Sequence, residues 1–188
     1  MGICLVMVRL SDAAIDEICA TPKKAVHFWM QDEAPEPAPA GFLGRLFGKK
    51  DEGLQKCSVP REAGDETDLD KAWDAMDYLL SEQRRIKGVA RFLTEGGEEV
   101  PEEIGYGHSR MIRSAAVKDI NALLTNVTPE LLRLRYDPQA MHRETIYPRR
   151  WARDGDKGFE YIVSFLEPLR RFISETAQRG LGVMIVYT

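Results

Sequence analysis

Neither the few cysteines nor the few histidines of this chain follow a recognisable pattern. The three cysteines are an odd number at irregular intervals, and no histidine lies at a metal-ligand spacing from another histidine or from a cysteine: Cys4, Cys19, Cys57, His27, His108 and His142. This distribution disfavours a disulfide framework and a zinc site. We therefore expect reduced thiols, no metal and no cofactor.

The chain also lacks a hydrophobic run of membrane-spanning length. The apolar start, residues 1–8, is interrupted by Arg9, well short of the roughly 20 residues that a transmembrane helix needs. It has no basic leader and no small-residue cleavage site, so it does not have the features of a signal peptide. From these absences we expect a soluble, cytoplasmic protein without membrane contact.

Sequence motifs of the common catalytic and nucleotide-binding sites are absent too. No Gly-x-Ser-x-Gly elbow, P-loop or Cys–His signature occurs, and Arg110 stands where a dinucleotide fingerprint has its third glycine. Nucleophilic and phosphoryl-transfer chemistry therefore have no positive support. The net charge of −4, from 26 basic and 30 acidic residues, argues against nucleic acid as a partner.

The composition is that of a folded protein. A chain of 188 residues, 44% hydrophobic and 30% charged, is long enough for one domain with a sizeable core. Residues 3–8 and 181–187 are continuous apolar runs, typical of strands covered on both faces. We expect the two to be neighbours in one small sheet, which places both chain ends together. The predicted fold class is α+β: a single helix-rich domain on a small sheet that includes the N- and C-terminal strands.

Local signals mark the helices between these strands. Ser11, Thr128 and Asp137 are good N-caps, and the last two precede prolines that suit a first helical turn. Further helices are expected after Thr21-Pro22, from Asp68 or Asp70, from Ser114, and over residues 156–179, where Pro168 should kink the helix or split it in two. Residues 86–93 favour a strand or a helix equally, and residues 95–103 are expected to form an acidic loop.

Residues 34–66 differ from the rest in composition. Three prolines between residues 34 and 40 remove amide donors, and a short basic, glycine-containing piece follows at residues 42–50. We predict a mobile Pro/Gly-rich surface excursion at about 34–66, within a single domain over residues 1–188.

The first candidate site follows this excursion. Asp68, Asp70 and Lys71 are carboxylates next to an amine, which would suit acid–base chemistry or a divalent ion. They equally suit the start of a helix, where acidic residues complement the helix dipole, and this structural interpretation is favoured. Trp73, one turn later, is expected in the core rather than at a ligand.

Two further segments carry candidate binding residues. Gly105-Tyr106-Gly107 is typical of a turn that could present Tyr106 or Arg110 to a cleft. Tyr147, Arg150 and Trp151 lie in a segment, residues 141–153, with four arginines against one glutamate, a local charge of +3. Such a segment could bind phosphate, nucleic acid or an acidic protein. The alternative is a solvated loop anchored to the core by its aromatic side chains.

Taken together, these segments resemble the YfbM-like family of bacterial proteins, a domain of unknown function. The resemblance rests on motifs spread over nearly the whole chain outside residues 34–66: Val8-Arg9-Leu10-Ser11, Asp68-Leu69-Asp70-Lys71-Ala72-Trp73, Tyr78-Leu79-Leu80, Gly96-Gly97, Gly105-Tyr106-Gly107 with Arg110, Tyr136-Asp137-Pro138, Ile146-Tyr147-Pro148 with Trp151, and the strand after Gly180. It implies an α+β domain in a bacterial cytosol and no reaction. His108 departs from the pattern, where a small residue or proline is more usual.

Three hypotheses about function follow. The leading one is a non-enzymatic module that binds another protein, as an immunity or accessory protein for a toxin, because charge is segregated into an acidic segment at 95–103 and basic segments at 84–91 and 143–153. The second is an enzyme or small-ligand-binding protein with a cleft near Asp70, Tyr106, Arg110 and Trp151. The third, RNA binding through Arg149, Arg150 and Trp151, ranks last because of the acidic net charge.

Overall fold

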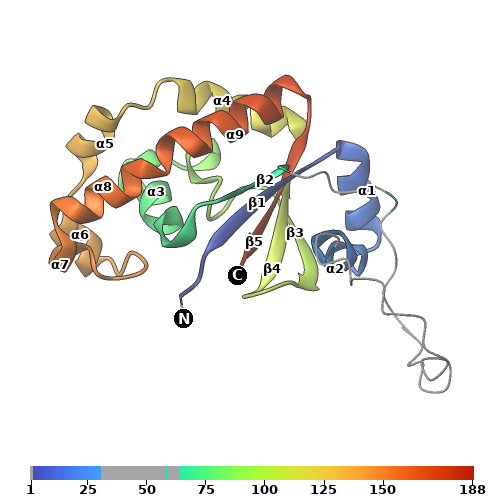
Figure 1. Cartoon of the computed structure of the whole chain (residues 1–188), viewed down its shortest axis with the longest axis horizontal. Helices are drawn as coiled ribbons and strands as arrows, with labels where there is room; N and C mark the ends of the chain where they lie inside the picture. Colours follow the sequence, from blue (N-terminus) through green and yellow to red (C-terminus); the bar gives the residue numbers. More distant parts are fainter. Residues whose placement is uncertain (1, 31–57, 59–63) are drawn as a thin grey trace, which may run out of the picture.

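One antiparallel sheet of five strands forms the centre of the molecule (Figure 1). The structure, a computed structural model, describes residues 2–30, 58 and 64–188. The strand order across the sheet is β2-β1-β5-β4-β3. The strands are β1 (Leu5–Leu10), β2 (Glu66–Asp68), β3 (Glu98–Glu103), β4 (His108–Ile112) and β5 (Gly182–Tyr187).

The strands from the two ends of the chain are neighbours, as predicted. β1 and β5 pair along their whole length, with Leu5 opposite Tyr187 and Leu10 opposite Gly182. Beyond the strands, the backbone N–H of Cys4 donates to the Thr188 carbonyl at 2.7 Å, and the Thr188 N–H donates back to Cys4 at 2.9 Å. The predicted α+β fold, with both terminal strands in one sheet, is therefore confirmed.

Helices cover the two faces of the sheet unequally (Figure 1). The smaller layer consists of α1 (Asp12–Ala20) and α2 (Lys24–Trp29). The other side carries α3 (Trp73–Leu80), α4 (Ser114–Thr125), α5 (Pro129–Arg135), α6 (Pro138–Arg143), α7 (Trp151–Asp154), α8 (Asp156–Ser164) and α9 (Leu166–Gln178). Two short 3-10 helices, η3 (Asp70–Ala72) and η4 (Gly88–Arg91), flank α3 in sequence. None of the helices described is long and apolar enough to cross a membrane.

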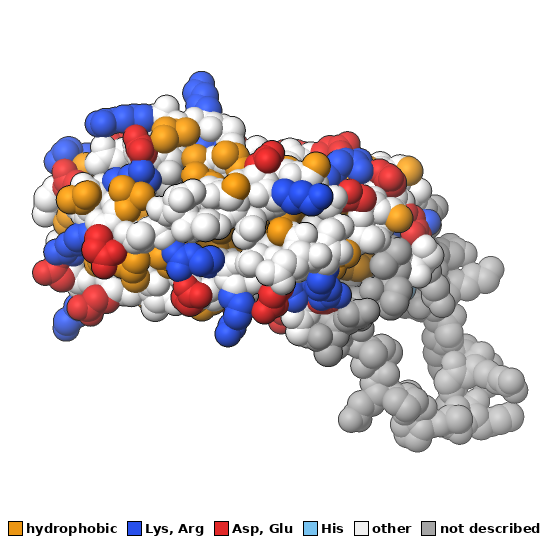
Figure 2. Space-filling model, turned by 90° about the horizontal axis from the view of Figure 1, so that it is seen from above, with side chains coloured by type: hydrophobic (Ala, Val, Ile, Leu, Met, Phe, Trp, Pro, Cys, Tyr) orange, Lys and Arg blue, Asp and Glu red, His pale blue; other side chains and the backbone are white. Residues whose placement is uncertain are grey.

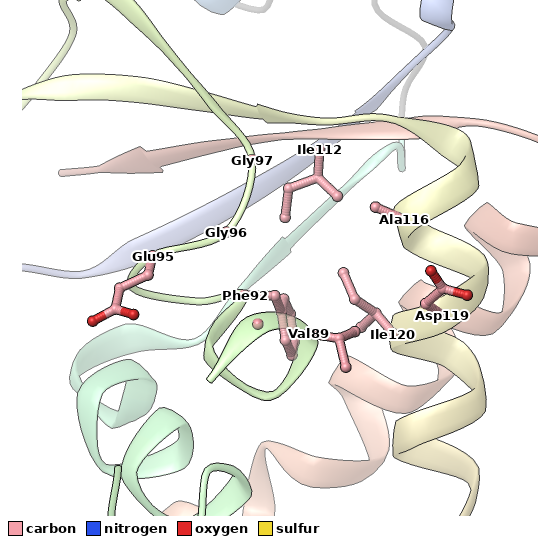
Figure 3. Close-up of a pocket in the computed structure, with 10 residues that line it drawn as sticks. Val89, Phe92, Glu95, Gly96, Gly97, Ile112, Ala116, Asp119 and Ile120 are labelled. Carbon is pink, nitrogen blue, oxygen red and sulfur yellow. The ribbon is translucent and has the colours of Figure 1, made fainter. Parts of the chain in front are cut away.

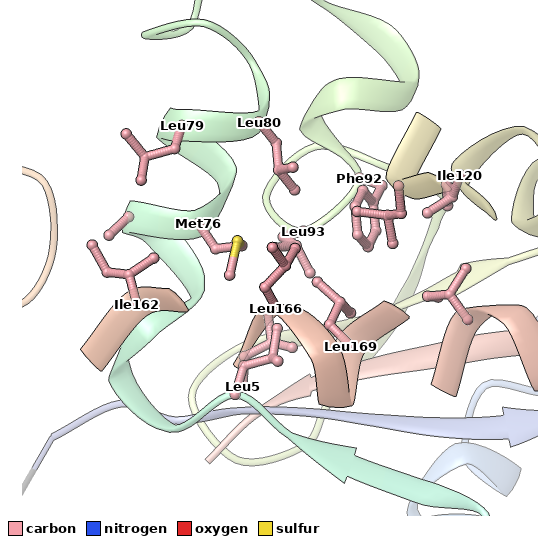
Figure 4. Packing of buried hydrophobic residues seen from close by; sticks show 14 of the residues in the cluster. Leu5, Met76, Leu79, Leu80, Phe92, Leu93, Ile120, Ile162, Leu166 and Leu169 are labelled. Carbon is pink, nitrogen blue, oxygen red and sulfur yellow. The ribbon is translucent and has the colours of Figure 1, made fainter. Parts of the chain in front are cut away.

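Each central strand contributes side chains to two separate cores. Leu5 and Met7 of β1 belong to the larger cluster, whereas Val8 and Leu10 belong to the smaller one. This alternation follows from the two-residue period of a strand, and it explains why every residue of β1 except Arg9 is apolar. The larger core packs side chains of α3, α4, α8 and α9 over β1 (Figure 4): Leu5, Met76, Leu79, Leu80, Phe92, Leu93, Ile120, Ile162, Leu166 and Leu169.

The helix caps predicted at Ser11, Thr128 and Asp137 are present, whereas α2, expected to start at Thr21-Pro22, begins at Lys24 without a side-chain cap. Ser11 Oγ accepts a hydrogen bond from the Ala14 N–H at 3.2 Å, and Thr128 Oγ1 accepts one from the Leu131 N–H at 3.2 Å. The Asp137 carboxylate accepts from two first-turn amides at 2.9 Å each. The long helix expected over residues 156–179 is split at Phe165 into α8 and α9. Pro168 then lies in the first turn of α9, where its missing N–H breaks no helical bond.

Of the two helix starts expected, Asp70 is confirmed and Asp68 is wrong. Asp68 ends β2, while η3 begins at Asp70 and leads directly into α3 at Trp73, which has no side-chain cap. The reason is that the strand ladder continues past Asp68: the Leu69 N–H donates to the Leu5 carbonyl at 2.9 Å. The Asp68 carboxylate accepts the Asp70 N–H at 2.6 Å, which forms a turn instead of a helix cap.

Two other segments also differ from expectation. Residues 95–103, expected to be a loop, contain β3, which pairs with β4 at the edge of the sheet and buries only Val100 completely. Residues 86–93 form η4 and turns instead of a longer element. Most of the excursion predicted at 34–66 lies outside the described residues, and its last residue, Glu66, begins β2.

Candidate functional site

Aromatic side chains from distant segments meet around the start of β1. Trp73 stacks on Tyr147 with 5.5 Å between ring centroids, and it meets the edge of Tyr187 at 5.0 Å. Trp73 Nε1 donates to the Ile3 carbonyl at 3.0 Å, and the Ile3 N–H donates to Tyr147 Oη at 2.5 Å. Two of the predicted site segments therefore come together, and they hold the residues that precede β1.

Gly2 shows how closely this segment is packed. A Cβ atom on Gly2 would lie 2.2 Å from Lys71 Cε and 2.7 Å from Tyr147 Oη, closer than real Cβ contacts. The side chains of Lys71 and Tyr147 thus pack directly against the backbone of Gly2. This close approach leaves no room for a ligand at the Gly2 position.

The Asp70 carboxylate is committed to hydrogen bonds within the protein. Oδ2 accepts from Tyr161 Oη at 2.7 Å, and Oδ1 accepts from Cys4 Sγ at 3.2 Å and lies 3.5 Å from Lys71 Nζ. Burial raises the pKa of Asp70, but these hydrogen bonds and the Lys71 charge outweigh burial, so its pKa is lowered. Burial and Asp70 raise the pKa of Cys4, which keeps it a thiol donor. Asp68 is exposed, and among the described residues its carboxylate accepts only the turn amide described above.

The side chains of Arg150 and Trp151 are also used within the fold. Trp151 is completely buried, and its Nε1 donates to the Ile146 carbonyl at 3.0 Å, which agrees with the core interpretation of this aromatic. Arg150 lies over the Tyr161 ring, 5.5 Å from its centroid, and pairs with Asp154 at 3.1 Å. Trp151 is therefore unavailable to a ligand, whereas the side chain of Arg150 is 40% exposed and has Asp154 as its ion-pair partner.

Arg110 holds a loop rather than a ligand. It is 7% exposed, and its guanidinium donates to the carbonyls of Leu93 at 2.5 Å and Gly96 at 2.7 Å and to Tyr187 Oη at 3.0 Å. Tyr106, in contrast, is 57% exposed on the β3–β4 turn. Its N–H donates to the Tyr187 carbonyl at 2.7 Å, so this turn is joined to the end of β5.

The candidate residues therefore form a contact cluster. Asp70, Lys71, Trp73 and Tyr147 converge, and Arg110 and Tyr106 are linked to them through Tyr187. The three pockets that we describe are lined by other residues. Within the described part of the chain, no three His, Cys, Asp or Glu side chains are grouped to hold a metal ion.

A pocket that sequence reasoning missed lies between η4, the Gly96–Gly97 turn and α4 (Figure 3). Its volume is about 420 Å³. Its walls are mostly apolar, with one carboxylate at each side: Gly88, Val89, Phe92, Glu95, Gly96, Gly97, Ile112, Ala116, Asp119 and Ile120. The glycine pair was the only local signal for it, because the other lining residues are ordinary core and helix residues.

The charged surfaces differ in how far they are neutralised. On β3, Glu99 lies 2.6 Å from His108 Nδ1 and Glu98 lies 3.5 Å from Arg113, while no ion pair of Glu102 or Glu103 is found among the described residues. In the basic segments, four of the seven arginines pair with carboxylates of described residues: Arg84 with Asp74 at 2.7 Å, Arg91 with Asp77 at 2.9 Å, and Arg150 and Arg153 with Asp154 at 3.1 Å and 2.7 Å. On the face that carries α4, α8 and α9, basic and acidic side chains alternate (Figure 2). The β3 edge thus carries four carboxylates, two of them without an ion pair to any described residue.

Comparisons with known proteins agree with this architecture. The structure is similar to that of YfbM from Escherichia coli, described as a protein of unknown function, with a TM-score of 0.64 and 13% sequence identity over 98% of this chain and 99% of that chain. At this identity the likeness shows the fold alone. No curated protein matches the sequence. Residues 1–186 match the family described as a domain of unknown function, DUF1877. The chain has the same fold as YfbM. By the match over residues 1–186, it belongs to the DUF1877 family.

Proposed function

We propose that this protein is a non-enzymatic binding module that recognises a basic surface of another protein through the β3 edge. The observation that carries the proposal is an edge strand with four glutamates in six residues, three of them exposed and Glu102 partly exposed: Glu98, Glu99, Glu102 and Glu103. Such a surface steers a cationic partner during association and discriminates against acidic ones.

The edge position supports this use of the strand. β3 pairs with β4 on one side only, and a bulge interrupts its register between Glu99 and Glu103. Pro101 lacks an amide hydrogen, which blocks continuous pairing with another strand. The partner is therefore expected to contact glutamate side chains rather than extend the sheet.

An immunity or accessory protein for a toxin is the specific form of this proposal. Such a protein acts by covering a partner's surface and needs no reaction of its own. The alternative, an enzyme or small-ligand site near Asp70, Tyr106, Arg110 and Trp151, has less support because the polar groups of Asp70, Arg110 and Trp151 are hydrogen-bonded within the protein.

The test is affinity capture with the full chain from cells of the source organism. Two double variants are compared with the wild type: Glu102→Lys/Glu103→Lys on β3 and, as a control, Glu130→Lys/Glu160→Lys on α5 and α8. Each takes the net charge from −4 to 0, since each glutamate-to-lysine change adds two charges. We expect the wild type and the control to retain the same partner, and the β3 variant to lose it.

Capture should also weaken as salt rises, because exposed charges are screened beyond about 10 Å at 0.1 M ionic strength. Repeated capture of no protein, or equal retention of one partner by both double variants, would count against binding through β3.

A further inference from the structure

The pocket between η4 and α4 is separate from the acidic edge, and its shape is that of a small-molecule site. A volume of about 420 Å³ lies in the usual range for such sites. Apolar side chains from three segments line it (Figure 3): Val89, Phe92, Ile112, Ala116 and Ile120. Phe92, Ile112 and Ile120 are at most 2% exposed and packed in the larger core, so they form a rigid floor.

The wall opposite α4 is held in place by hydrogen bonds from the Arg110 side chain to backbone carbonyls. Arg110 donates to the Leu93 and Gly96 carbonyls, which fixes the turn that carries Gly96 and Gly97. Gly97 has φ +86°, and a Cβ atom there would lie 2.5 Å from the Met111 carbonyl oxygen. The pocket is therefore formed in advance of any ligand, which lowers the entropic cost of binding.

The charged residues that line this pocket are both acidic. Glu95 pairs with Arg91 at 2.8 Å, and its carboxylate points away from the apolar side chains (Figure 3). The Asp119 carboxylate, on α4, has no ion pair or hydrogen bond with any other described residue. It lies one helical turn from Ala116, on the same side of α4. The pocket thus presents one unpaired negative charge beside an apolar floor.

We propose that this pocket binds a small organic cation, with an apolar chain or ring against Phe92, Ile112 and Ile120 and one protonated amine beside Asp119. No lysine or arginine lines the pocket, so it offers no cationic side chain to an anionic ligand. A neutral ligand of the same shape would gain the apolar contacts but not the charge interaction. This inference does not depend on protein binding at β3.

Three six-carbon probes of equal length separate these cases: hexylammonium, hexanol and hexanoate. Binding to the full chain is measured by titration with NMR detection of the backbone amides of Val89, Gly97 and Ala116. We expect hexylammonium to bind roughly two- to fivefold more tightly than hexanol, the effect of one exposed charge pair, and hexanoate to bind most weakly.

Three variants assign the binding to this pocket. Asp119→Asn should bring hexylammonium to the affinity of hexanol, and Ala116→Phe, which fills the pocket, should abolish binding of both. Glu160→Gln, an exposed carboxylate change on α8, is the control and should change nothing. If Ala116→Phe does not fold, Val89→Arg at the pocket mouth should repel hexylammonium and spare hexanol.

Any of three results would overturn the proposal. One is that no probe shifts the three amides at the highest soluble concentration. Another is that hexanoate binds as well as hexylammonium. The third is that the preference for hexylammonium survives in Asp119→Asn.

Discussion

At the scale of single residues, the most unusual group is Asp77 on α3. Its side chain is completely buried, Oδ2 lies 2.9 Å from Arg91 Nε, and Oδ1 has no hydrogen-bond partner among the described residues. Burial raises the pKa of Asp77 to about 6, because the cost of burying the charge exceeds the stabilisation that Thr94 and Arg91 provide. The charged form of this acid is therefore a destabilising element at neutral pH.

This raised pKa predicts a pH dependence of stability. The folded protein keeps the Asp77 proton up to about pH 6, whereas the unfolded chain loses it near the ordinary value of 3.8. The Asp77 contribution should therefore make the free energy of unfolding fall as pH rises from about 4 to 6, by about 3 kcal/mol at most. In Asp77→Asn this part of the fall should be missing. The measurement is urea unfolding of both proteins across that range.

Asp119→Asn serves as the control, since Asp119 is exposed and should leave the pH profile of the wild type unchanged. An equal fall in the wild type and in Asp77→Asn would show that Asp77 is not the titrating group.

At the scale of elements, the turns around the pocket depend on glycine for different reasons. Gly97 and Gly88 both have positive φ, +86° and +71°, which L side chains rarely adopt. Only at Gly97 does a Cβ atom also meet backbone, the Met111 carbonyl oxygen at 2.5 Å; at Gly88 nothing lies within 4 Å. An alanine at Gly88 would therefore meet backbone strain alone, whereas an alanine at Gly97 would meet both backbone strain and a steric clash.

We expect Gly88→Ala to cost about 1 kcal/mol, the strain of a left-handed alanine, and Gly97→Ala to cost at least about 2 kcal/mol, since β3 or β4 must also shift. Urea unfolding of both variants measures the difference. Equal costs at the two sites would mean that the Gly96–Gly97 turn yields without disturbing the β3–β4 pair.

At the scale of the whole molecule, β5 joins the two halves of the core. Val183 and Ile185 lie in the larger cluster, and Met184 and Val186 lie in the smaller one. The small layer, α1 and α2, rests on a strand that the large layer also covers. Unfolding of either layer would remove the packing on one face of β5 and so weaken the strand that the other layer needs. We therefore expect the two layers to unfold together.

Tryptophan fluorescence can test this cooperativity. Trp29 lies in α2 against the smaller core, and Trp151 lies in the larger core. A Trp73→Phe/Trp151→Phe variant leaves Trp29 as the reporter, and a Trp29→Phe/Trp73→Phe variant leaves Trp151. In each variant the urea midpoint from fluorescence should coincide with that from far-ultraviolet circular dichroism. A lower fluorescence midpoint for Trp29 alone would show that the small layer unfolds first.

Several features of this protein followed from the sequence by itself. The terminal strands, the caps at Ser11, Thr128 and Asp137, and the break near Pro168 all rest on signals between residues close in the chain. Hydrophobic periodicity, capping and proline geometry are local properties, so they can be read without knowing the partners. The resemblance to the YfbM-like family is confirmed by the match over residues 1–186.

Other features were decided only by tertiary structure. β3 is acidic and contains Pro101, yet it is a strand because β4 lies beside it and its outer edge faces solvent. Arg110 could have faced a ligand, but its guanidinium meets loop carbonyls brought from residues 93–96. The pocket joins residues 88–97 to Ile112 and residues 116–120. Such contacts depend on how distant segments pack, and no local pattern of residue types encodes that packing.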